Sequence, residues 1–131
     1  MNPFAFGSTN FQGAMAIYDV MVIRIFMSTA LLPAFGIFVR GQVKPLINQN
    51  LIHHNGLAGI RFTEQSGGQV EHNIIEENTY FGVDVAAVGR LQFERNSFRR
   101  NGGFGVSAIE AAQVNFAHNN FDANGQGEIR Y

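Results

Sequence analysis

Apolar residues in the second half of the chain recur with a period of 23 in four parallel series. These series are Ile47, Val70, Phe93 and Phe116; Ile52, Ile75, Phe98 and Phe121; Ile60, Val83, Val106 and Ile129; and Phe62, Val85, Ala108 and Tyr131. Within each repeat, apolar and other residues alternate over short segments that are bounded by Asn or Gly, as in 60–62. Alternation over so few residues is typical of half-buried strands and disfavours helices.

Two series of asparagine keep the same period. They are Asn50, Asn73, Asn96 and Asn119, and Asn55, Asn78, Asn101 and Asn124. Asparagine tolerates the left-handed conformation of turns, and its amide can bond to an equivalent amide stacked on it. We therefore expect each asparagine to have a left-handed backbone conformation at a corner of the coil. We also expect each series to form an asparagine ladder. Gly59, Gly82 and Gly105 are expected where the backbone requires positive φ.

A repeat of this length with several short strands has the size of one coil of a parallel β-solenoid. Successive coils would stack about 4.8 Å apart, so that equivalent residues touch. The sequence predicts an all-β solenoid of about 5–6 coils within its 131 residues. Arg61 and Asp84, which are one period apart, support this register by their opposite charges. Glu71 and Glu94 are a like-charged exception.

The N-terminal part of the chain keeps the period but loses the asparagines. Gly13 and Gly36 are one period apart, whereas Met27 and Leu32 occupy the two asparagine positions. We interpret residues 1–45 as irregular apolar coils that form a cap or contact region. Residues 46–131 are then the regular repeats, and the whole chain is a single domain.

An alternative interpretation of the N-terminal part is a membrane span over residues 20–39, which is just long enough. Arg24, Pro33 and Gly36 lie inside this stretch and argue against a span. The preserved glycine spacing also favours a coil, so a membrane partner is not expected.

Composition narrows the classes of function. The net charge is −1, from 9 Lys and Arg against 10 Asp and Glu, and only one of these cations is lysine. Nucleic acid and anionic membranes are bound by clustered cations, so neither partner is expected. The chain has no cysteine, which excludes disulfides, cysteine–zinc motifs and a thiol nucleophile. It has 15 glycines and 13 asparagines, which indicates many ordered turns.

The repeats resemble those of the right-handed parallel β-helix superfamily, which includes pectate-lyase-like and mannuronan-epimerase-like enzymes and NosD-like proteins. The units are INQNLIHHNGLAGIRF, VEHNIIEENTYFGVDV, FERNSFRRNGGFGVSA and FAHNNFDANGQGEIRY. The resemblance implies a right-handed parallel β-helix, an extracellular or periplasmic location and a polysaccharide ligand. It implies Ca²⁺ only for the lyases of the group, so no cofactor is assigned.

Five charged residues are the candidate binding residues: Arg61, Glu71, Asp84, Glu94 and Arg95. Glu71 and Glu94, stacked one coil apart, could share a hard cation through their oxygens. Arg61 or Arg95 could bind the carboxylate of a uronate. No catalytic residue is assigned, because the Asp-Pro-His run of the epimerases that the repeat resembles is absent.

The histidines do not predict a metal site. His72 and His118 share a column but are two coils apart, roughly 9.6 Å, which is too far for one zinc ion. His53 and His54 are adjacent, so in a strand they would point to opposite sides.

Two phenylalanines, Phe81 and Phe104, share a column beside Tyr80. They either offer a stacking platform for sugars or pack over a turn.

Three functions follow as hypotheses. The first is a non-catalytic structural or carbohydrate-binding module. The second is a subunit that stacks end to end on copies of itself, and the third is a polysaccharide lyase or epimerase that acts on uronates.

Overall fold

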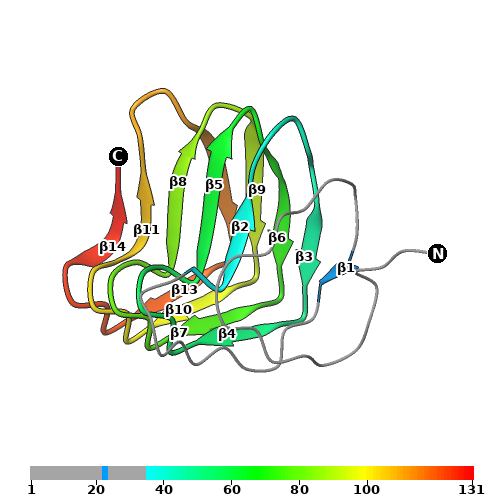
Figure 1. Cartoon of the computed structure of the whole chain (residues 1–131). Coiled ribbons are helices and arrows are strands. Elements are labelled where there is room, and N and C mark those ends of the chain that lie inside the picture. The colour runs from blue at the N-terminus through cyan, green and yellow to red at the C-terminus, as the bar shows by residue number, and fades with distance from the viewer. Residues whose placement is uncertain (1–21, 24–34) are drawn as a thin grey trace.

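The computed structural model describes residues 22–23 and 35–131, and these residues form three parallel sheets that wind as a solenoid (Figure 1). Sheet I contains β1 (Val22–Ile23), β3 (Leu46–Asn48), β6 (Gly68–Glu71), β9 (Arg90–Glu94) and β12 (Gln113–Ala117). Sheet II contains β4 (Leu51–His53), β7 (Ile74–Glu76), β10 (Ser97–Arg99) and β13 (Asn120–Asp122). Sheet III contains β2 (Ile37–Val39), β5 (Ile60–Glu64), β8 (Val83–Ala87), β11 (Phe104–Ala108) and β14 (Gly127–Arg130).

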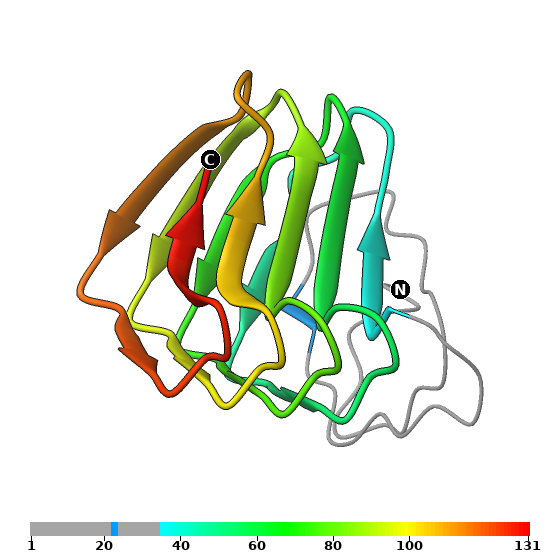
Figure 2. The same ribbon diagram turned by 90° about the vertical axis from the view of Figure 1, so that its left-hand side faces the viewer.

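From β3 onward, the chain visits sheets I, II and III in that order in each coil, and the pairing confirms the register that the period predicts. Val70 pairs with Phe93 in sheet I, and Ile75 pairs with Phe98 in sheet II. The described residues form about four coils. The additional coils expected from the chain length fall in the N-terminal part, outside the described residues. Figure 2 shows the strands of sheet III lying side by side along the solenoid.

The apolar series fill the interior, because every second residue of a strand points inward. Val70, Ile75, Val83 and Phe62 are completely buried. Equivalent phenylalanines stack along the axis, with ring centroids 5.3 Å apart for Phe93 and Phe116 and 4.9 Å apart for Phe98 and Phe121. The hydrophobic columns therefore join successive coils as well as the three sheets.

Both asparagine series form the expected ladders. The Oδ1 atom of Asn96 accepts two hydrogen bonds from Asn73, at 3.0 Å from its backbone N and 3.0 Å from its Nδ2. The Nδ2 atom of Asn96 donates to Asn119 Oδ1 and to the carbonyl oxygen of Val70. The second ladder repeats the pattern through Asn78 and Asn101, with Nδ2 to Oδ1 at 2.9 Å. Each internal amide therefore binds both the coil before it and the coil after it.

The expectation that the asparagines themselves are left-handed is wrong. Positive φ falls on the residue before each asparagine, at Gln49, His72, Arg95 and His118 in one corner and His54, Glu77, Arg100 and Ala123 in the other. The left-handed residue turns the chain so that the next side chain points into the ladder. Its own side chain points outward.

The expected reason for the glycine series is also wrong. Positive φ occurs at Gly41, Gly68 and Gly127, whereas Gly59, Gly82 and Gly105 do not have it. A Cβ atom on Gly82 would lie only 2.5 Å from the carbonyl oxygen of Gly105. The series is therefore required by the close approach of successive coils.

The period of 23 extends into the N-terminal part as far as β2, where Ile37 pairs with Ile60. In β1, Val22 pairs with Leu46, which is 24 residues further along the chain, so this pairing departs from the period by one residue. The positions of Gly13, Arg24, Met27, Leu32 and Pro33 lie outside the described residues. Among the described residues, no helix has the length and apolar character to cross a membrane.

Replacing Asn96 by alanine should destabilise the fold, because the backbone N and the Nδ2 of Asn73 would both lose the Oδ1 atom to which they donate. We expect a loss of about 2–3 kcal/mol in the free energy of unfolding, measured by urea denaturation. The control is Asn120→Ala in exposed β13, which should cost less than about 0.5 kcal/mol. Equal effects in the two variants would contradict a stabilising role of the ladder amide.

Candidate functional site

The outer face of sheet III carries a polar column, formed by residues that alternate with the core positions of its strands. Arg61 in β5 binds Asp84 in β8, with Nη1 and Oδ2 2.7 Å apart. Arg130 in β14 donates from Nε and Nη2 to Ser107 Oγ in β11, at 3.1 and 2.8 Å. The column is therefore tied together in two pairs, each spanning one coil.

Aromatic rings at the beginning of these strands, or just before them, flank the polar column. Phe81 and Phe104 lie one coil apart, with ring centroids 6.4 Å apart and planes inclined by 31°. The guanidinium carbon of Arg130 lies 5.2 Å and 5.4 Å from the two centroids. The guanidinium carbon of Arg61 likewise lies 5.3 Å from the ring centroid of Phe35. Both arginines are thus held against rings as well as polar partners.

A shallow hollow of about 130 Å³ lies where the polar column meets the aromatic residues. We call it the aromatic hollow, and its lining residues are Phe35, Leu57, Ala58, Arg61, Tyr80, Phe81 and Asp84. Tyr80 is 54% exposed, so its ring is available to a ligand. The structure thus places the Arg61–Asp84 pair beside Tyr80 and Phe81, two of the aromatic residues for which the sequence left a sugar platform and packing over a turn as alternatives.

The Asp84 carboxyl is in an unusual electrostatic environment. Burial raises the pKa of Asp84 above its ordinary value, and this effect exceeds the opposing attraction of Arg61 and Arg130. Its ion pair with Arg61 therefore offsets only part of the cost of taking the carboxylate out of water. The main effect of the ion pair is therefore to hold the Arg61 guanidinium and the Asp84 carboxyl at the hollow, and its contribution to the stability of the fold is small.

The other three candidate residues lie elsewhere, at the end of the sheet I strands. Glu71 and Glu94 are register partners in β6 and β9, as expected. Glu94 accepts a hydrogen bond from Arg95, at 2.6 Å between Oε1 and Nη1. In the part of the chain that the structure describes, no group of three or more His, Cys, Asp or Glu residues is arranged to hold a metal ion.

A larger hollow of about 450 Å³ on the outer side of sheet I was not expected from the sequence. Its lining residues are Lys44, Pro45, Leu46, Gly68, Gln69, Arg90, Leu91, Gln92 and Asn115. Gln92 pairs in register with Gln69 on one side and with Asn115 on the other. The regular spacing of these three amides, one period apart, is the signal that could have revealed them.

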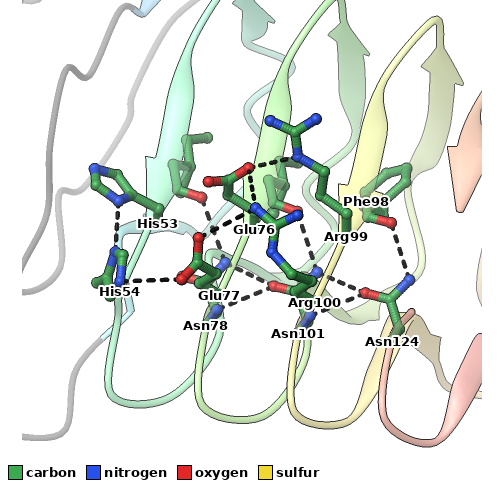
Figure 3. Close-up of polar contacts among 12 residues, drawn as sticks. His53, His54, Glu76, Glu77, Asn78, Phe98, Arg99, Arg100, Asn101 and Asn124 are labelled. Atoms are coloured by element: carbon green, nitrogen blue, oxygen red, sulfur yellow. Dashed lines mark hydrogen bonds and ion pairs between the residues drawn. The ribbon is translucent and has the colours of Figure 1, made fainter. Parts of the chain in front are cut away.

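Charged residues line the outer corner between sheets II and III (Figure 3). Arg99 donates from Nε to Glu76 Oε1 at 2.5 Å. Arg100 lies between two carboxylates, with Nη2 3.3 Å from Glu77 Oε1 and 3.4 Å from Glu76 Oε1. The hydrogen bond from Arg100 holds the pKa of Glu77 below its usual value.

The expectation that His53 and His54 point to opposite sides is wrong. Their Nδ1 atoms lie 2.6 Å apart, because His54 has a φ of 56° and turns back beside its neighbour (Figure 3). Burial, and then the proximity of His54, lowers the pKa of His53. His72 and His118 occupy equivalent left-handed corners, with the corner of Arg95 between them.

The parallel strands, the two asparagine ladders and the apolar interior define the chain as a β-solenoid domain with hollows on its outer faces. A family model described as a right handed beta helix region matches residues 16–130. The chain therefore belongs to the right-handed β-helix family, which confirms the resemblance of its repeats. No curated protein and no solved structure matches it significantly.

The raised pKa of Asp84 predicts a pH-dependent effect of Asp84→Asn. A carboxyl with a higher pKa in the folded state favours folding below its unfolded pKa of about 3.9. That contribution is lost as the pH rises through the folded pKa. Relative to the wild type, the variant should therefore gain stability from about pH 3 to pH 7, measured by urea denaturation. The control is Asp122→Asn in the exposed last coil, and the same trend in both variants would contradict the assignment.

Proposed function

We propose that the chain is a non-catalytic, carbohydrate-binding β-helix module that binds polysaccharide at the aromatic hollow. The observation that carries this proposal is the position of Tyr80 and Phe81 directly beside the Arg61–Asp84 pair. We further propose that the module works outside the cell or in the periplasm, where polysaccharides are its accessible partners.

Sugars present two kinds of surface, and the aromatic hollow offers a partner for each. The apolar C–H face of a sugar ring can lie on an exposed aromatic side chain such as Tyr80. Its hydroxyl groups need directed donors and acceptors, which Arg61 and Asp84 provide from fixed positions. The interactions that hold these side chains before binding reduce the entropy lost when a ligand binds.

The charge around the aromatic hollow favours acidic sugars over neutral ones. Arg61 and Arg130 face the single carboxyl group of Asp84, so guanidinium groups outnumber carboxyl groups in the column. Arg130 bonds only to a neutral hydroxyl in the column, that of Ser107. Its guanidinium can therefore pair with a uronate carboxylate without breaking an ion pair.

The binding test is a glycan array of neutral and uronate oligosaccharides, followed by calorimetric titration of the strongest ligand. Tyr80→Ala should weaken binding about tenfold, because ring stacking contributes on the order of 1.4 kcal/mol. The matched control is Ile74→Ala, which removes an exposed apolar side chain from sheet II and should leave affinity unchanged. The proposal would be refuted if no oligosaccharide on the array bound the protein, or if the wild type and Tyr80→Ala bound with equal affinity.

A second candidate function is self-association, and one observation favours it. Four inward-facing apolar residues of the last coil are only partly buried: Val114, Phe116, Phe121 and Ile129. Their strands, β12, β13 and β14, are the terminal strands of the three sheets among the described residues. We propose a second copy of this chain as the partner of this face, because a net charge of −1 gives little repulsion between copies.

Sedimentation velocity over a range of concentrations tests the association. The wild type should form dimers or longer species, and Ile129→Asp should shift the protein to monomer. Val88→Asp places the same charge at another exposed apolar position and is the control. A monomeric wild type at high concentration would exclude this candidate.

A further inference from the structure

We propose that the His53–His54 pair is a binding site for a borderline divalent transition-metal ion such as Zn²⁺. The two Nδ1 atoms lie 2.6 Å apart and face each other at the outer corner of the first regular coil (Figure 3). Two imidazole nitrogens aimed at one point are a chelating pair, which isolated surface histidines do not provide.

The backbone creates this convergence. His53 is the last residue of β4, and His54 follows it with a φ of 56°. In a continuous strand the two rings would lie on opposite faces. The left-handed corner instead brings their centroids to 4.7 Å, with the planes inclined by 76°. The same corner directs Asn55 into its ladder, so the ladder holds the chain on which both rings are mounted.

Glu77 supports the ligand role of His54. Its Oε2 lies 3.4 Å from His54 Nε2, on the side of the ring away from His53. A carboxylate at this position favours a proton on Nε2 and leaves the Nδ1 lone pair for a metal ion. Arg100 binds the other oxygen of the same carboxylate, at 3.3 Å from Oε1. The arrangement is a carboxylate–histidine pair whose free nitrogen points at the second histidine.

Metal binding requires only a small rearrangement. In the metal-free pair, one Nδ1 donates a hydrogen to the other. Binding moves this proton of His53 from Nδ1 to Nε2 through solvent, so no net proton is released. Two nitrogens on one tetrahedral ion, each at about 2.0–2.1 Å, are separated by about 3.3 Å. Rotation of the exposed His54 ring supplies the difference, and water completes the coordination.

The direct test is titration of Zn²⁺ into the protein, prepared without affinity-tag histidines, in competition with a chromophoric chelator. We expect saturable binding of one ion at micromolar Zn²⁺ and none of Ca²⁺, which prefers oxygen ligands. His53→Ala and His54→Ala should each weaken binding at least about tenfold. Glu77→Gln should weaken it about tenfold, because it removes the charge behind His54.

The matched controls are His72→Ala and His118→Ala, which remove histidines from left-handed positions of the other corner that carry no partner histidine. Both should bind Zn²⁺ as the wild type does. Circular dichroism of each variant separates loss of a ligand from loss of the fold. In the wild type, ring nitrogen NMR shifts should move at Nδ1 of His53 and His54. The proposal is overturned if binding is absent, if His53→Ala and His54→Ala bind normally, or if the controls lose binding equally.

Discussion

The stacking of equivalent residues in successive coils is the constraint on which the structure depends, and the asparagine ladders fix it. A parallel strand pair alone can slip along its length, whereas a buried amide satisfies its donors and acceptor at one register only. Asn73 bonds to Asn96, and Asn96 to Asn119, at the same distance of 3.0 Å. The apolar columns then stack in phase, and the phenylalanines pack face to face along the axis.

The fold could be predicted from the sequence because, in a solenoid, the residues that contact each other between coils recur at a fixed interval along the chain. Residues one period apart are neighbours in space, so one interval gave the strand register, the core columns and both ladders. The backbone details could not be read in the same way. A recurring glycine indicates either positive φ or close approach, and only the folded structure shows that Gly82 lies against the Gly105 carbonyl.

The candidate sites were harder to predict because they join columns rather than residues within one column. The period places Asp84 beside Arg61, and the structure confirms it. Nothing in the period places Phe81 beside Arg130, which lies two coils further along the chain. That contact depends on how close the backbone of each corner lies to the sheet and on the rotamers of long side chains. The His53–His54 contact depends likewise on a corner φ that alternation does not reveal.

The corners connect the stability of the fold to the chemistry of its surface. Every ladder asparagine is preceded by a left-handed residue, whose side chain must point outward when the amide points inward. The ladder therefore requires the backbone shape of that position and leaves its side chain unconstrained. In the second corner this position is occupied by His54, Glu77, Arg100 and Ala123. Four chemically different side chains thus share one backbone conformation. Side chains that bind a ligand can thus occupy the left-handed corner positions without disturbing the contacts that hold the coils together.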